Sequence, residues 1–469
     1  MTTRRLQALV FLLALLVGAP AETRAQATRP RTATPPPSQT QTPARPTTTL
    51  PAQTPTVVPT FTPTPTPLPF EGVAARVNPY HAPYPHGILV QRRSGETVIE
   101  QGADQLFNPA SAVKLATSLV ALRTLGPNYR FPVGVWMTGT FDRASGTITG
   151  DLVISGRDPS FHYEHAVSVA RELNLMGVRT VTGDLIVAPR FTMNFNGSSL
   201  RSGERLYDTL DSTRRPAAAA RAWLEARTAL KDTASLQTTP SVAVMGAVYV
   251  DSVPPGATHL LTHNSSTLVD ILKVLLCYSN NFMAERLGDT LGGASGVEQY
   301  LERELQIQPA AMRLASTSGL GVNRLSPREM MKIYLALVDE LREHNLKASD
   351  IMPVAGIDPG TLERRYAAHP ARGSIIAKTG TLIRTDGGAS ALVGQFRAQN
   401  GETFYFVIFN QRGSVARFRS AQDSLLYNLQ LARGGPALFP YAPHALAMRL
   451  VSTEYNRTAA ADEYEPTAN

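Results

Sequence analysis

The sequence of 469 residues contains one cysteine, Cys277, which excludes an internal disulfide framework and a metal site built from cysteine thiolates. It contains no G-x-S-x-G motif, which argues against an α/β-hydrolase. Charged residues make up only 17% of the chain and hydrophobic residues 43%, so most of the chain can bury a core. The length predicts two or three domains.

The chain also lacks a strong basic surplus in its central and C-terminal parts. The net charge is +8, but residues 1–69 contain six arginines and one glutamate and account for +5 of it. The remaining 400 residues therefore carry only +3. A nucleic-acid-binding protein needs a basic face on its folded part, so we predict no nucleic-acid partner.

Long apolar runs are missing except near the N-terminus, where Ala8 to Val17 follow Arg4 and Arg5. The run is too short for a spanning helix, and the small residues of Ala25-Gln26-Ala27 fit a signal-peptidase site. We therefore predict a cleaved signal peptide over residues 1–27 and an exported protein that works in the periplasm or cell-wall space. The alternative is an uncleaved membrane anchor.

Residues 28–69 form a separate low-complexity segment with 13 prolines and 14 threonines in 42 positions. Such a composition cannot bury apolar surface, and proline favours extended polyproline II. We predict a disordered linker that tethers the folded part at the cell surface. Passive disorder without a spacer role is the alternative.

Folding signals begin near residue 70, with a hairpin over 87–100. A helix follows to Leu125, with Asn108 as its N-cap and Pro109 at its first position. Residues 131–254 change character and are predicted to form an inserted domain. Its expected elements are a hairpin of strands 133–141 and 147–154, a helix 166–176, a strand 183–187, a helix 204–231 and a strand 241–251.

Helices dominate the chain after residue 255, and three strand candidates and a last helix follow them. The helices are expected at 267–277, 282–291, 297–305, 327–345 and 415–432, and the strands at 375–379, 390–396 and 403–410. This order predicts an antiparallel sheet flanked by helices, with a separate helical cluster. Residues 70–130 and 255–435 would form this discontinuous catalytic domain, and residues 436–469 a tail with little pattern.

Three short motifs carry residues suited to nucleophilic chemistry. In Ser111-Ala-Val-Lys114, the positions i and i+3 share a helix face, so the lysine amine can reach the serine hydroxyl. In Ser279-Asn280-Asn281, a hydroxyl and a carboxamide can point into one site, although a plain helix cap is the alternative. In Lys378-Thr379-Gly380-Thr381, Lys378 and Gly380 share one face of a strand, and the glycine lets a substrate backbone lie close.

Each motif is weak alone, but the order S-x-x-K, S-x-N, K-T-G is that of serine β-lactamases and penicillin-binding proteins. The chain resembles the penicillin-binding D-alanyl-D-alanine carboxypeptidase/endopeptidase family of the class C low-molecular-mass type. The resemblance covers about residues 75–435. Further segments that match the family are Asn108 to Leu115, Gly183 to Ile186, His263 to Ser266 and Ala355 to Arg364.

This resemblance implies an α+β or α/β fold of the β-lactamase/transpeptidase type with an inserted smaller domain, and a serine peptidase that needs no metal and no cofactor. Its partners would be peptidoglycan peptides, with β-lactams as covalent inhibitors. The oligomeric state is left open. Two rival functions are a serine β-lactamase, with Glu302 as the nearest candidate base, and a non-catalytic wall-binding protein.

The resemblance also implies residue roles. Ser111 is the nucleophile, Lys114 its base and Ser279 the proton relay, while Asn281 holds Lys114 and the substrate amide. Lys378, Thr379, Gly380 and Thr381 form the substrate-binding strand, and the backbone N–H groups of Ser111 and Thr381 the oxyanion hole. Lowering the lysine pKa by about 3 units needs about 4 kcal/mol, which burial and the positive charge of Lys378 can supply.

The sequence departs from the family pattern in three places. Ser111 and Ser279 are only 168 residues apart, so one inserted domain is expected to be reduced or missing. Residues 316–321 replace a stretch that usually begins Asp-Gly-Ser-Gly, and Pro359 is an extra residue in the A-G-x-D-G-T-L run.

Three further features of the sequence resemble sites but are interpreted as structural. His162 and His165 are interpreted as surface polar residues, because no third metal ligand occurs at a familiar spacing. Cys277 is predicted to pack in the core. The glycine-rich residues 292–296 lack the strand and lysine of a phosphate loop.

Overall fold

The computed structural model describes residues 86–443 and 445–458. The predicted signal peptide over residues 1–27 and the predicted linker over 28–69 lie outside the described residues. Within the described ranges, no helix combines the length and the apolar character needed to cross a membrane.

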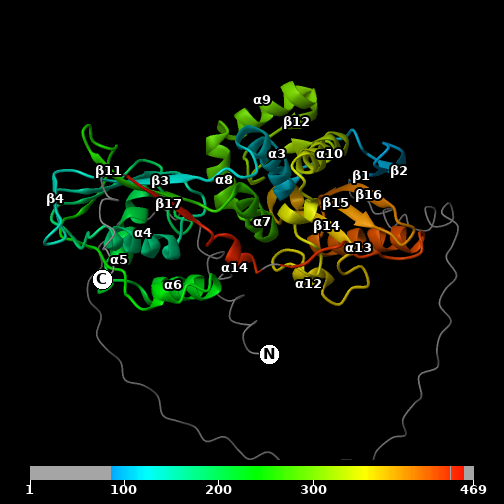
Figure 1. The fold of residues 1–469 in the computed structure, drawn as a ribbon. Helices are drawn as coiled ribbons and strands as arrows, with labels where there is room; N and C mark the ends of the chain where they lie inside the picture. The colour runs from blue at the N-terminus through cyan, green and yellow to red at the C-terminus, as the bar shows by residue number, and fades with distance from the viewer. Residues whose placement is uncertain (1–85, 444, 459–469) are drawn as a thin grey trace, which may run out of the picture. The chain divides into compact units, whose positions relative to one another are not determined.

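The part of the chain that carries the three motifs contains a five-stranded sheet in the order β14-β15-β16-β1-β2, in which all neighbours are antiparallel (Figure 1). Its strands are β1 (His86–Arg92), β2 (Thr97–Gln101), β14 (Ile375–Leu382), β15 (Ala389–Arg397) and β16 (Thr403–Gln411). The first two strands therefore complete a sheet whose other members lie almost 300 residues later. The predicted antiparallel sheet is confirmed.

Both faces of this sheet are buried, and alternate residues point to opposite sides. Phe404, Phe406 and Ile408 pack with Leu425 and Leu429 of α13 (Val415–Leu431) on one face. Tyr405, Val407 and Phe409 pack on the other face, in the larger core formed with the helical cluster. This double burial explains why the strands are continuous apolar runs in the sequence.

The helical cluster lies on the sheet face opposite to α13 (Figure 1). Its main helices are α3 (Val113–Leu125), α7 (Leu268–Tyr278), α8 (Asn281–Thr290), α9 (Gly293–Leu305) and α10 (Pro327–Glu343). Each was predicted within a few residues, and the largest differences are at the starts of α3 and α9, which each differ from the prediction by four residues. The shorter helices of this part are α11 (Ala348–Ile351) and α12 (Glu363–Tyr366), with a two-stranded ribbon of β12 (Met312–Arg313) and β13 (Arg324–Leu325).

The inserted segment begins with a long bent hairpin that contributes to two sheets. Its arms are β3 (Pro132–Met137) with β4 (Thr140–Asp142), and β5 (Thr147–Thr149) with β6 (Leu152–Gly156). One end joins a six-stranded sheet in the order β10-β8-β6-β3-β11-β17, and the other a four-stranded sheet in the order β4-β5-β7-β9. The remaining short strands are β7 (Thr180–Val181), β8 (Leu185–Val187), β9 (Ala243–Val244) and β10 (Val248–Val250).

Two predictions for this segment were wrong in detail. The single helix expected over 204–231 is two helices, α5 (Ser199–Leu210) and α6 (Ala217–Ala229), which follow α4 (Tyr163–Leu175) in the chain. Pro216 is the N-cap of α6 and has extended backbone angles, so the helix cannot run through it. The strand expected over 241–251 is divided between β9 and β10, which belong to different sheets.

The six-stranded sheet also takes in strands from outside residues 131–254. β11 (Thr258–Asn264) pairs with β3, and β17 (Glu454–Arg457) pairs with β11. The stretch after residue 436, for which we expected little pattern, contains α14 (Leu446–Arg449) and this last strand. The C-terminal segment is therefore part of the folded body.

A buried ion pair fixes helix α7, which leads to the second motif. Lys273 Nζ lies 2.7 Å from Asp358 Oδ2, and neither side chain is exposed. The ammonium also donates to the carbonyl oxygens of Ser349 and Met352, both at 2.8 Å. Asp358 accepts from Val354 N and, on its other oxygen, from the Tyr441 hydroxyl. The A-G-x-D stretch of the sequence thus serves to hold α7.

We predict that Asp358→Ala lowers the free energy of unfolding by about 3–5 kcal/mol, because it leaves the Lys273 charge buried without its counterion. Urea denaturation measures this. The matched control is Arg342→Ala, which removes the exposed Arg342–Asp339 pair and should cost less than about 1 kcal/mol. Equal effects of the two substitutions would contradict the structural role of the buried pair.

Candidate active site

The first motif lies in a tight turn rather than in the first turn of an α-helix. Residues Ala110–Ala112 form a 3₁₀ turn, and α3 begins only at Val113. Asn108 is not the N-cap of α3. Its Oδ1 accepts from Ala110 N at 3.0 Å, and its amide donates to Gly321 O and to Asp386. The predicted cap was wrong because the side chain stabilises the turn and ties it to two distant loops.

Close backbone approaches fix this turn from two sides. A Cβ on Gly380 of β14 would lie 2.6 Å from Pro109 O, and one on Gly319 would lie 2.0 Å from Ala110 O. Ala110 itself has a φ of 46°, which is unusual for a residue with a side chain. Glycine at both contact positions therefore allows the turn that carries Ser111 to pack between the third motif and the 316–321 loop.

Lys114 is the centre of the hydrogen-bond network. Its Nζ donates to Ser111 Oγ at 3.0 Å, to Asn281 Oδ1 at 2.7 Å and to Ser318 O at 2.6 Å. The side chain is fully buried, whereas Ser111 is only partly buried. The amine is thus held against the nucleophile candidate by one residue of the second motif and by one backbone carbonyl.

The second motif connects two helices. Ser279 is the C-cap of α7 with a φ of 55°, and Asn280 is the N-cap of α8, its side chain accepting from Met283 N. The helix-cap interpretation is therefore correct for this segment, and it is compatible with the functional one. The short connection between the helices places Asn281 at Lys114 and Ser279 at the third motif.

The third motif lies on β14, at the edge of the sheet. Lys378 Nζ donates to Ser279 Oγ at 2.8 Å and to Thr379 O at 2.7 Å. A continuous chain of contacts therefore joins Ser111, Lys114 and the second motif to Lys378. The structure brings together the side chains that we predicted from three separate parts of the sequence. Thr381, at the end of the motif, is partly exposed.

Burial dominates the electrostatics of both lysines. It lowers the pKa of Lys114 to about 7, while the carboxylate of Glu285 acts in the opposite direction. Burial, followed by repulsion from Lys114, lowers the pKa of Lys378 well below its ordinary value. Burial thus explains the expected neutral amine of Lys114. The positive charge of Lys378, which we had predicted as a second cause, does not contribute to lowering this pKa. A fraction of Lys114 is uncharged near pH 7.

Glu285 is a residue that the sequence reasoning missed. It lies one helical turn after Asn281 on α8, and its carboxylate accepts from Ser318 N at 3.1 Å and from the Thr317 hydroxyl at 2.9 Å. Ser318 in turn accepts from Lys114 through its carbonyl oxygen. Glu285 therefore positions the loop that holds Lys114. The i, i+4 spacing to Asn281 was the only signal available in the sequence.

Arg419 is a second residue that was missed. It lies on α13, and its guanidinium donates to Thr381 Oγ1 at 2.9 Å. Together they line a cavity of about 470 Å³ with Ile383 and residues 413–416. Because Lys378 is fully buried and its pKa is lowered, the exposed guanidinium is the more accessible positive group beside Thr381.

The other residues that we considered in the sequence lie outside this hydrogen-bond network. Cys277 is buried without a disulfide, and burial raises the pKa of its thiol to about 12, so the core-packing interpretation is confirmed. Glu302 lies on α9 as expected. The interpretation of His162 and His165 as surface residues was wrong for His165, which is only 2% exposed. His162 is largely buried, with 13% of its side chain exposed.

Comparison with known proteins identifies the family. The model of the D-Ala-D-Ala carboxypeptidase 3 (S13) family matches residues 84–222 and 211–428. The chain belongs to this family of serine peptidases. It is 26% identical to a carboxypeptidase DacB of Mycolicibacterium smegmatis over 378 residues, which covers 72% of this chain and 78% of the relative.

Solved structures support the fold of the family. A predatory peptidoglycan endopeptidase of Bdellovibrio bacteriovorus matches with a TM-score of 0.63 and 22% identity, over 76% of this chain and 95% of that one. Penicillin-binding protein 4 of Haemophilus influenzae matches with a TM-score of 0.57 and 19% identity, over 76% and 99%. The predicted transpeptidase-like α+β fold and the predicted family are thus confirmed.

We predict that Glu285→Gln moves the acid limb of the profile of kcat/KM against pH to lower pH. The carboxylate stabilises the Lys114 ammonium, so its removal lowers the lysine pKa and the neutral amine forms at lower pH. Hydrolysis of a D-Ala-D-Ala peptide from pH 5 to 9 measures the limb. Glu302→Gln, on the neighbouring helix, is the control and should leave it in place. A limb that moves upward in Glu285→Gln would contradict the assignment.

We predict that Arg419→Gln raises KM for a peptide with a free C-terminal carboxylate by up to about fivefold, the range of an exposed ion pair. The kinetic constants for the same peptide with a C-terminal amide should change little. Arg417→Gln, exposed on the same helix, is the matched control. Equal losses for both peptides would show that Arg419 does not contact the carboxylate.

Proposed function

We propose that this protein is a serine-type D-Ala-D-Ala carboxypeptidase that acts on peptidoglycan stem peptides through an acyl-enzyme at Ser111, and that it also cleaves cross-links as an endopeptidase. The observation that carries the proposal is the placement of Lys114 Nζ between Ser111 Oγ and Asn281 Oδ1. Membership of the S13 family supports the substrate.

In the acylation step, Ser111 Oγ attacks the carbonyl carbon between the two D-alanines while its proton passes to the neutral amine of Lys114. The backbone N–H groups of Ser111 and Thr381 would stabilise the oxyanion. The close packing of Gly380 against the turn that carries Ser111 supports this placement. The C–N bond then breaks, and the terminal D-alanine leaves as an amine.

Ser279 is suited to deliver a proton to that amine. Its oxygen accepts from Lys378 Nζ, so its own hydrogen can pass to the leaving nitrogen while a proton from the Lys378 ammonium replaces it. The two lysines together then hold as many protons as before, because Lys114 has gained the proton of Ser111. The carboxylate of the substrate would lie near Thr379, Thr381 and Arg419. This negative charge favours the protonated form of Lys378 and thereby the neutral form of Lys114, because two adjacent ammonium groups repel each other. Water then hydrolyses the ester.

The same site would react with β-lactams, which resemble the substrate. The Bdellovibrio endopeptidase is known in a form acylated by penicillin G, which supports this extension. The apolar run over residues 8–17 and the Pro/Thr-rich segment support the further proposal that the protein is exported and tethered in the periplasm or cell-wall space.

We predict that excess penicillin adds one acyl group to Ser111 and that Ser111→Ala abolishes it. The same substitution should lower D-alanine release from a D-Ala-D-Ala peptide by at least about a thousandfold, because the nucleophile is lost. Mass spectrometry and a D-alanine assay measure the two results. Ser145→Ala, in the exposed hairpin turn, is the control. Rapid penicillin turnover without D-alanine release would indicate a β-lactamase, and unchanged release in Ser111→Ala would disprove the mechanism.

A further inference from the structure

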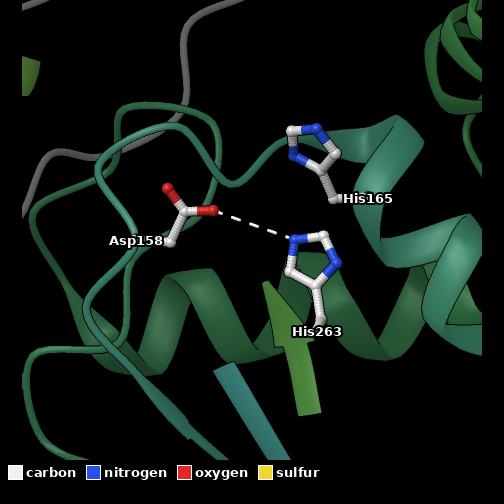
Figure 2. A group of neighbouring side chains, drawn as sticks. All are labelled: Asp158, His165 and His263. Atoms are coloured by element: carbon white, nitrogen blue, oxygen red, sulfur yellow. Dashed lines mark ion pairs between the residues drawn. The ribbon is translucent and has the colours of Figure 1, made fainter. Parts of the chain in front are cut away.

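A cluster of three buried side chains lies outside the site described above. Asp158 follows β6, His165 is in the first turn of α4, and His263 is on β11, so residues 105 positions apart meet (Figure 2). The potential ligand atoms of the three side chains lie within 4.8 Å of one another, and each side chain is at most 2% exposed. His263 supplies the additional ligand that was not visible from the spacing of His162 and His165.

Two members of the cluster have polar atoms without hydrogen-bond partners among the described residues. These atoms are Asp158 Oδ2 and both ring nitrogens of His263. The nearest approach between them is 3.9 Å, from His263 Nε2 to Asp158 Oδ2, which is too long for a hydrogen bond. Polar atoms buried without partners destabilise the folded state, so we expect a bound group to contact these atoms.

The third member, His165, donates one ring N–H to a backbone carbonyl, as metal-binding histidines commonly do. His165 Nε2 lies 2.7 Å from Leu450 O, which fixes its hydrogen there and leaves the lone pair on Nδ1. Nδ1 now accepts from His162 N at 3.0 Å, and this one hydrogen bond would be exchanged for a metal bond. The other oxygen of Asp158 is likewise held, by the backbone N–H and hydroxyl of Ser160.

We propose that Asp158, His165 and His263 bind a divalent transition-metal ion of the zinc type. Two imidazole nitrogens and one carboxylate oxygen form a ligand set typical of such ions, whereas calcium and magnesium prefer oxygen ligands throughout. The cation would supply the buried carboxylate with a countercharge. The ion would also hold His165, whose Nε2 contacts Leu450 O, and would thereby link the C-terminal segment to the inserted sheet. Its role would be structural.

The test uses the full chain, produced separately in media supplemented with zinc, cobalt or manganese, since the buried ligands must be loaded during folding. After dialysis against a chelator, elemental analysis should find about one metal ion per chain. X-ray absorption at the metal edge should show two imidazole ligands and a carboxylate. This second measurement needs no variant.

Asp158→Asn and His263→Gln should each reduce the metal content to below about 0.1 per chain, while His344→Gln, an exposed histidine, should retain it. Penicillin acylation of Ser111 verifies that each variant is folded. A metal-free wild type in all three media, metal retained by both variants, or an edge spectrum with oxygen ligands alone would each overturn the proposal.

Discussion

The site depends on the burial of Lys114. An ammonium group removed from water is unstable relative to the neutral amine, and no carboxylate among the described residues is hydrogen-bonded to this nitrogen to compensate. The surrounding residues keep the Lys114 side chain buried and hold its nitrogen in place. The helical cluster encloses the side chain, Asn281 and Ser318 orient its nitrogen, and Glu285, one contact further out, limits how far the pKa falls.

The division of exposure within the site follows from the same constraint. The two lysines are fully buried, whereas Ser111, Ser279, Asn281 and Thr381 are partly exposed. The groups that would meet the substrate are thus at the surface, and the groups that set their protonation are behind them. Substrate can therefore bind without hydrating the amine.

Much of this arrangement could be predicted from the sequence, because each motif is local and its order is informative. The helices around Ser279 and the strand around Lys378 were placed within a few residues. Glu285, Arg419 and the His263 cluster were not predicted, since their roles come from contacts between segments far apart in the chain. Asn108 was misassigned because a cap and a turn-stabilising asparagine give the same sequence signal. Pro216 was a local signal that the helix prediction overlooked.

The last strand has a consequence for the inserted sheet. β17 covers the backbone groups of β11 that β3 leaves free. A chain cut before Glu454 would present that edge of β11 to solvent, and an uncovered edge is a template for pairing with another molecule. We therefore expect a chain shortened at its C-terminus to self-associate through this edge of β11.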